Sequence, residues 1–216
     1  SFAYGKPELS DRALAEIGRA HFDLSDLVQA FPGERDQNVL FRDRDQRLLL
    51  MKIANRGERL ETLEFQNAIL CRLQERDPGL APRPVRSGSG ELVVTADTPE
   101  GPRLVRALTF VAGEPLARVT KDMRLWRGLG RKLGRLSAAL QDFSHPGGAR
   151  PDFLWNLDRA EVALGWIDEV EDGPTRKLIA DFSRDRLGPL RARSAGLRKA
   201  VLYQDANDHN VLVHDL

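Results

Sequence analysis

The chain has 216 residues and a formal net charge of +1, with 41% hydrophobic and 30% charged residues. This composition is typical of a globular chain with its own core, and it excludes a disordered or fibrous protein. The balanced charge gives no reason to expect nucleic acid or a membrane as partner, and no apolar run is long enough to span a bilayer. The single cysteine, Cys71, excludes an intramolecular disulfide and fits a reducing compartment, so we expect a cytoplasmic protein.

The first half of the chain predicts antiparallel strands interrupted by one helix. Short apolar runs separated by clusters of Pro, Gly and Asp are typical of hairpins. The predicted strands cover residues 24–31, 38–42, 48–53, 92–96 and 104–111. A helix is expected over residues 58–75, because leucines recur there at helical spacing.

The second half predicts helices. Over residues 122–143 the apolar side chains form one stripe, which we interpret as core packing: Met123, Trp126, Leu129, Leu133, Leu136, Leu140 and Phe143. Further helices are expected near residues 157–170 and 175–187, and strands at 200–202 and 211–213. The chain therefore divides into a β-rich lobe, residues 1–108, and a hinge with a mainly helical lobe, residues 109–216.

A polar segment, residues 203–210, lies between the last two predicted strands. Asp205 and Asn210 have the D-x-x-x-x-N spacing found in the catalytic loop of kinases. In phosphoryl transfer a carboxylate orients the proton of the attacking hydroxyl, and an amide oxygen can ligate Mg²⁺, which prefers oxygen ligands. Because polar loops contain such pairs by chance, this spacing alone is a weak signal.

Lys52 strengthens the signal, because it lies inside the apolar strand 48–53. A buried ammonium needs an anionic partner, which in a kinase-like lobe is a nucleotide phosphate together with an acid on the following helix. The alternative is a lysine on the solvent face of an edge strand, with Met51 and Ile53 facing inward. The sequence leaves both interpretations open.

In this order the motifs resemble the aminoglycoside phosphotransferase superfamily, most closely its hydroxylysine-kinase-like branch. The segments that carry the resemblance are E-R-D-Q-N at 34–38, M-K-I-A-N at 51–55, Q-N-A at 66–68, V-A-G-E-P-L at 111–116 and D-A-N-D-H-N-V-L-V at 205–213. The resemblance covers nearly the whole chain. It implies an α+β, bilobal protein-kinase-like fold, with an antiparallel sheet in the N-lobe and a mainly helical C-lobe.

The resemblance also implies a function and a site. It predicts an ATP-dependent kinase that phosphorylates a hydroxyl of a small amine-bearing molecule, such as hydroxylysine or an amino alcohol. Asp205 would be the catalytic base and Asn210 a ligand of Mg²⁺. The implied nucleotide-binding residues are Lys52 at the phosphates, Thr109 and Val111 in the adenine-binding hinge, and Arg35, Gln37 and Asn38 in the turn over the triphosphate.

Several positions depart from the family pattern. The phosphate-covering turn has one glycine, Gly33, and the position of the usual lysine-pairing Glu is held by Gln66. We therefore take Gln66 and the nearby Glu64 as candidates for orienting Lys52. Tyr203 and Gln204 stand where many relatives have His-Gly, a change that we expect to be tolerated.

The second metal ligand of a kinase, an Asp downstream of the Asn-bearing strand, is not found before Leu216. Asp215 is too close to Asn210 to fill this role, so we interpret it as a solvent-exposed charge. We expect the helical lobe to be incomplete and to continue in a longer parent chain with further domains, for example a pyridoxal-phosphate aminotransferase. The alternative function is a non-catalytic kinase-like interaction or regulatory domain of such a protein.

Overall fold

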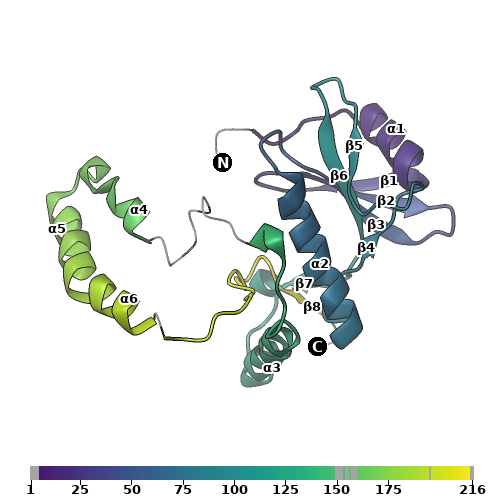
Figure 1. Cartoon of the computed structure of the whole chain (residues 1–216). Coiled ribbons are helices and arrows are strands. Elements are labelled where there is room, and N and C mark those ends of the chain that lie inside the picture. Colours follow the sequence, from purple (N-terminus) through teal and green to yellow (C-terminus); the bar gives the residue numbers. More distant parts are fainter. Residues whose placement is uncertain (1–4, 149–152, 154–155, 157–159, 195, 215–216) are drawn as a thin grey trace. The chain divides into compact units, whose positions relative to one another are not determined.

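Figure 1 shows the chain as a computed structural model, which describes residues 5–148, 153, 156, 160–194 and 196–214. The helices are α1 (Asp11–Phe22), α2 (Leu60–Arg76), α3 (Met123–Ala139), α4 (Ala160–Leu164), α5 (Gly173–Phe182) and α6 (Gly188–Ser194). The strands are β1 (Leu24–Phe31), β2 (Gln37–Asp43), β3 (Leu48–Ile53), β4 (Pro84–Val85), β5 (Val94–Ala96), β6 (Arg103–Thr109), β7 (Glu114–Pro115) and β8 (Leu212–Val213). Residues 1–148 and 200–216 form one compact unit, and residues 149–199 form a second.

An antiparallel sheet organises the first unit. Its strand order is β1-β2-β3-β6-β4, and β5 also pairs with β6. The five predicted strands of the first half are all present, and β3 has the predicted bounds. Because β3 lies between β2 and β6, Lys52 is on a central strand, and the edge-strand interpretation of this lysine is wrong.

One face of the sheet carries the hydrophobic core. The register aligns Val39, Met51 and Ala107 across β2, β3 and β6, and all three side chains are fully buried. Helix α1 belongs to the same core through Leu14 and Ile17. Successive residues of a strand point to opposite faces, so the residues next to these three along each strand belong to the other face of the sheet.

Helix α1 is not among the predicted elements. Its start carries a recognisable signal, because Ser10 caps the helix by accepting a hydrogen bond from the Ala13 N–H. Its buried positions, Leu14, Ile17 and Phe22, also recur at helical spacing. Asp23 ends the helix with a left-handed backbone, at φ 55°.

The opposite face of the sheet is polar at its centre. There Asn38, Lys52 and Arg106 lie side by side across β2, β3 and β6. Helix α2 reaches this face, since Gln66 and Asn67 both accept hydrogen bonds from Arg106. This row of side chains is where the predicted phosphate site lies.

The apolar stripe of α3 does not form a core in the described chain. Within α3 no residue is buried, and Met123 and Trp126 are 63% and 44% exposed. Leu140, just after the helix, is buried. The predicted core packing is therefore wrong for Met123 and Trp126 at the start of the stripe. The middle of the stripe is half-buried, at Leu129, Leu133 and Leu136. At its end, the ring of Phe143 stacks on Phe65 of α2.

The remaining elements differ from expectation at their ends. Residues 200–202 are not a strand, and none of the described strands lies beside them, whereas the last predicted strand appears as β8. The predicted helix at 157–170 is α4 and a short 3₁₀ turn, Ile167–Glu169, with residues 157–159 outside the described ones. Asp215 also lies outside the described residues. In the part of the chain that the structure describes, every helix is too short or too polar to cross a membrane.

Candidate nucleotide and phosphoryl-transfer site

Lys52 is largely buried and has one acidic partner nearby. Its ammonium Nζ lies 3.7 Å from Oδ2 of Asp36, and the Lys52 side chain is 22% exposed. Asp36 comes from the loop between β1 and β2. Burial lowers the pKa of Lys52, Asp36 opposes this effect, and the nearby positive charge of Arg106 reinforces it. An ammonium in this setting gains from a further anion.

Arg106 lies directly opposite Lys52 on the neighbouring strand and is 6% exposed. Its Nη1 donates to Oδ1 of Asn67 at 3.0 Å, and its Nη2 donates to Oε1 of Gln66. Burial lowers the pKa of Arg106, while Asp36 and Glu58 act in the opposite direction. The guanidinium stays charged, because the reference pKa of arginine is far above neutral pH.

The two residues predicted to orient Lys52 lie on different sides of α2. Gln66 is half-buried and its amide oxygen is engaged with Arg106, whereas the side chain of Glu64 is exposed. The carboxylate beside Lys52 belongs to Asp36 instead. A direct role of Gln66 or Glu64 in orienting Lys52 stays a prediction.

The predicted phosphate-covering turn packs tightly against β2. A Cβ on Gly33 would lie 2.4 Å from the Asp36 carbonyl oxygen and 2.5 Å from the side-chain nitrogen of Asn38, so only glycine fits there without movement. Arg35 forms an ion pair with Glu58 at 3.6 Å. We call the five charged residues at this place the lysine cluster: Lys52, Arg106, Arg35, Asp36 and Glu58.

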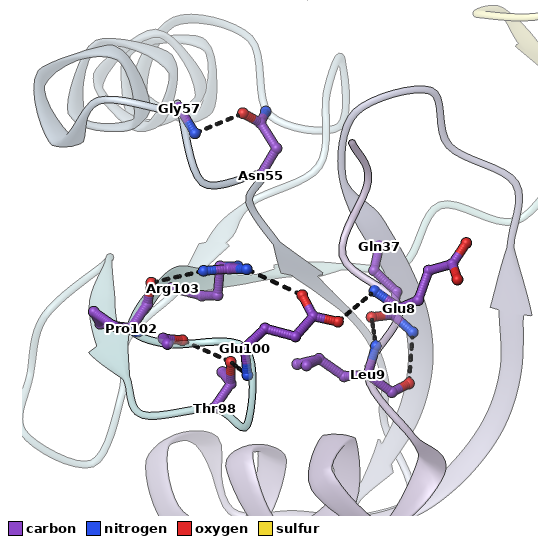
Figure 2. A network of polar contacts seen from close by, with 10 residues as sticks. Glu8, Leu9, Gln37, Asn55, Gly57, Thr98, Glu100, Pro102 and Arg103 are labelled. Atoms are coloured by element: carbon purple, nitrogen blue, oxygen red, sulfur yellow. Dashed lines mark hydrogen bonds and ion pairs between the residues drawn. The ribbon is translucent and has the colours of Figure 1, made fainter. Parts of the chain in front are cut away.

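A turn before α2 places Glu58, which completes the lysine cluster. Asn55 is buried, and its Oδ1 accepts a hydrogen bond from the Gly57 N–H at 3.0 Å, as Figure 2 shows. The Asn55 carbonyl also accepts the Glu58 N–H at 3.1 Å. This turn connects β3 to α2 and brings Glu58 to Arg35.

Gln37 and Asn38 lie on opposite faces of the sheet. Asn38 is in register with Lys52, whereas Gln37 is in register with the core residue Ile53. The Gln37 amide is engaged by the backbone of Leu9, whose N–H donates to it at 2.9 Å and whose carbonyl accepts from it at 3.0 Å (Figure 2). Any contact of Gln37 with a nucleotide on the Lys52 face would therefore involve its backbone.

The predicted hinge begins where the sheet ends. Thr109 donates its N–H to the Arg83 carbonyl at 2.9 Å, and the Phe110 N–H donates to Leu48 at 3.1 Å. The ring of Phe110 stacks on Phe31, with centroids 6.0 Å apart. Val111 follows with its side chain 42% exposed. Adenine binding by Thr109 and Val111 stays a prediction.

The predicted catalytic loop is held together by its own side chains. Nδ2 of Asn210 donates to Oδ2 of Asp205 at 2.7 Å and to the Asp205 carbonyl at 3.1 Å. Asn207 donates to the other carboxylate oxygen of Asp205 at 2.8 Å, and its own oxygen accepts the N–H groups of His209 and Asn210. Burial and the Asp205 charge raise the pKa of Tyr203, so its phenol stays neutral at neutral pH.

The segment after the hinge anchors this loop. The Leu116 N–H donates to the Val211 carbonyl at 2.9 Å, and the Ala117 N–H donates to the backbone carbonyl of Asp208 at 2.8 Å. Strand β7 pairs with β8 next to these bonds. Gly113 has φ +153°, and a Cβ there would lie 3.0 Å from the Val213 carbonyl oxygen. The catalytic loop is thus fixed on both sides of Asn210.

The donor set of the loop fits a hard cation. Asp205 and Asn210 offer carboxylate and amide oxygens, and their side chains are in contact at 2.7 Å. These are the ligand types that Mg²⁺ prefers. Within the described ranges no three His, Cys, Asp or Glu side chains gather as a metal site.

The site also contains residues that the sequence did not predict. Arg106, Asn67 and Asn207 make specific polar contacts with predicted site residues or next to them. Arg106 had one detectable signal, because it is the one charge in the predicted strand 104–111, as Lys52 is in the strand 48–53. Asn67 fills a gap in the apolar stripe of its helix, and Asn207 lies inside the recognised motif.

Comparisons with known proteins place this geometry in context. A family model described as "Phosphotransferase enzyme family" matches residues 11–215. Hydroxylysine kinase of Mus musculus is 25% identical over 231 residues, a match that covers 99% of this chain and 61% of that protein. The chain thus spans about three fifths of the length of this curated relative.

Solved structures with a similar fold include two kinases. Amicoumacin kinase, in complex with AMP-PNP, Ca²⁺ and Ami, has a TM-score of 0.62 at 14% identity, covering 88% of this chain and 55% of that one. Spectinomycin phosphotransferase, in complex with ADP and spectinomycin, has a TM-score of 0.60 at 13% identity, covering 97% and 67%. The predicted α+β kinase-like fold is confirmed by this likeness.

Proposed function

We propose that this chain, which belongs to the phosphotransferase enzyme family, moves the γ-phosphoryl group of ATP to a hydroxyl of a small molecule. The observation that carries the proposal is the Asp205–Asn207–Asn210 constellation, in which a carboxylate is held by two amide side chains on an anchored loop. Phosphoryl transfer relies mainly on positioning and charge neutralisation, and such a loop supplies positioning.

Each part of the site has a proposed role. Lys52 neutralises phosphate charge from the centre of the sheet, where a buried ammonium gains from an anion. Asp205 accepts a hydrogen bond from the acceptor hydroxyl and takes its proton as the oxygen attacks the γ-phosphorus. The bond from that phosphorus to the bridging oxygen breaks, and ADP leaves. Thr109, Val111, Arg35, Gln37 and Asn38 are the proposed further nucleotide contacts.

A Mg²⁺ ion fits the oxygen donors of this loop. Asn210 would hold it together with the phosphates of the nucleotide, and Asp205 lies in contact with Asn210. When bound, the ion would neutralise phosphate charge that develops during transfer. Asn207 keeps Asp205 oriented, because it holds the carboxylate oxygen that Asn210 does not.

For the acceptor we propose a small hydroxyl-bearing molecule with an amine, such as hydroxylysine or an amino alcohol. The support is the name of the relatives: the hydroxylysine kinases of Mus musculus and Danio rerio match 99% and 96% of this chain. A solved aminopropanol kinase with a TM-score of 0.54 has the same fold. We further propose that the protein acts in the cytoplasm, without a nucleic acid or membrane partner.

The test is acceptor-dependent release of ADP from Mg·ATP, with a panel of amine-bearing alcohols that includes hydroxylysine. We expect Asp205→Asn to lower turnover by about 10²–10⁴-fold, because the base is lost. Asp208→Asn, in the same loop, is the matched control and should retain turnover. Turnover of Asp205→Asn within a few-fold of the wild type would contradict the assignment of Asp205.

The same assay separates the proposal from a non-catalytic module. Such a module would bind Mg·ATP without releasing ADP for any acceptor, in the wild type as in the variant. Thermal stabilisation by Mg·ATP, measured in parallel, reports binding independently of turnover. The binding result therefore distinguishes a protein without turnover from a protein without a nucleotide site.

A further inference from the structure

Arg106 is a second buried cation beside Lys52, and the proposed function assigns it no role. The two residues are directly opposite in the β3–β6 register, and Arg106 is 6% exposed. Like charges opposite one another in a sheet repel, and a buried charge is tolerated only when it is well hydrogen-bonded or paired. The position of Arg106 therefore needs an explanation.

The hydrogen bonds of Arg106 come from α2 and are neutral. Asn67 accepts from Nη1 at 3.0 Å and Gln66 accepts from Nη2, so the helix holds the guanidinium in place without cancelling its charge. Asn67 is itself fixed, since it is 2% exposed and donates to the Leu92 carbonyl at 3.2 Å. The Nε of Arg106 is buried and has no hydrogen-bond partner in the described structure.

The position of Arg106 favours an anion on the side of Lys52 that faces the β1–β2 loop over one on the side that faces α2. The helix side of Lys52 is occupied by a fixed positive charge, while the loop side carries Asp36 at 3.7 Å. The charged groups around Lys52 are Asp36 from the loop and Arg106 from β6, with Glu58 and Arg35 completing the lysine cluster. A carboxylate at position 66 would pair with Arg106 and cancel the charge that the neutral Gln66 leaves in place.

We propose that Arg106, clamped to α2 by Gln66 and Asn67, is a positioning residue that keeps the Lys52 ammonium away from the helix and directs it toward the loop, where nucleotide phosphates replace Asp36. This inference rests on the proposed function, because it concerns the lysine of the proposed nucleotide site. It assigns Gln66 to Arg106 rather than to Lys52. Arg106 acts through Lys52 and need not contact the nucleotide.

The test is calorimetric titration of Mg·AMP-PNP into the full chain, from about pH 7 to about pH 10, a range that leads up to the reference pKa of lysine. Arg106→Met should weaken binding about tenfold at neutral pH, because Lys52 is no longer directed to the phosphates. It should also move the alkaline loss of affinity to higher pH, because a like charge that favours deprotonation of Lys52 is gone. Arg106→Lys should also bind more weakly than the wild type at neutral pH, because the two-pronged clamp is lost.

Arg103 provides a matched control. It lies on the same strand, is 7% exposed and points to the opposite face, where it donates to Glu100 at 3.0 Å and to the Pro102 carbonyl at 3.2 Å (Figure 2). Arg103→Met therefore removes an equally buried arginine without touching Lys52. We expect its nucleotide affinity and pH dependence to match the wild type.

Three results would overturn the inference: an unchanged pH dependence in Arg106→Met, equal effects of Arg106→Met and Arg103→Met, or wild-type affinity in Arg106→Lys. The lysine variant decides the question if Arg106→Met does not fold. Failure of the proposed function looks different, because the wild type itself would then not bind Mg·AMP-PNP.

Discussion

The charge of the lysine cluster is set by single residues, and Asp36 is the one that we expect to compete with a nucleotide. It is the acidic group nearest to Lys52, at 3.7 Å, and both side chains are about one fifth exposed. We expect a phosphate that binds Lys52 to displace this carboxylate. On this expectation, the Lys52–Asp36 ion pair of the protein without nucleotide opposes nucleotide binding.

Replacing Asp36 should therefore strengthen binding. We expect Asp36→Asn to lower the dissociation constant of Mg·AMP-PNP about fivefold at neutral pH, since a partly exposed ion pair contributes about 1 kcal/mol. The gain should disappear at alkaline pH, because Asp36 no longer raises the pKa of Lys52. Asp45→Asn, in the turn after β2, is the control. Unchanged or weaker binding in Asp36→Asn alone would show that Asp36 does not compete.

At the scale of elements, the loop between β1 and β2 depends on one glycine. Gly33 allows the Asp36 carbonyl and the Asn38 amide to approach a position where a Cβ would be 2.4 Å and 2.5 Å away. The same loop carries Asp36 and Arg35, whose partners lie on β3 and before α2. Its conformation therefore places two members of the lysine cluster.

A methyl group at this position should displace the loop. We expect Gly33→Ala to weaken nucleotide binding about tenfold, because a displacement of about 1 Å in a positioned site has effects of this order or larger. Its melting temperature should change little, because the loop lies outside the core. Gly128→Ala, where no atom lies within 4 Å of the added Cβ, should bind as the wild type does. Equal binding by the two variants would refute the tight packing of this loop.

At the scale of the whole molecule, burial is concentrated on one face of the sheet. Phe41 is fully buried there, in the cluster that α1 completes. Helix α3 has an apolar stripe but no buried residue, and Met123 is 63% exposed. We therefore expect the sheet and α1 to contribute much more to the free energy of unfolding than α3 does.

Urea unfolding can compare the two regions. We expect Phe41→Ala to lower the free energy of unfolding by about 3–5 kcal/mol, the usual cost of removing a buried aromatic side chain. Met123→Ser should lower it by less than about 0.5 kcal/mol, as an exposed substitution does. A cost for Met123→Ser similar to that of Phe41→Ala would show that the α3 stripe is buried in solution.

The sequence predicted much of this fold, and the failures have physical reasons. Strand 48–53 was predicted at its true bounds, because turn residues flank an apolar run on both sides. The contacts of Arg106 could not be predicted, since they depend on the β3–β6 register and on the approach of α2. The α3 stripe was assigned to a core because periodicity shows which face is apolar and not what covers it.

The candidate site was predicted to a similar extent. Asp205 and Asn210 lie in one loop with their side chains in contact, and Lys52 lies at the centre of the sheet, while the roles of all three stay predictions. The acid beside Lys52 was expected from the following helix and comes from the loop between β1 and β2, while Gln66 of that helix is engaged with Arg106. Side-chain pairing between distant elements is not encoded in local patterns.

The central claim is that the Lys52 face of the sheet binds the phosphates of a nucleotide. The most direct measurement is a calorimetric titration of Mg·ATP into the wild type, Lys52→Met and Asp205→Asn. We expect the wild type and Asp205→Asn to bind with similar affinity, and Lys52→Met to bind at least about tenfold more weakly, because a charge-assisted contact is lost. Absence of binding in the wild type, or equal binding by Lys52→Met, would contradict the claim.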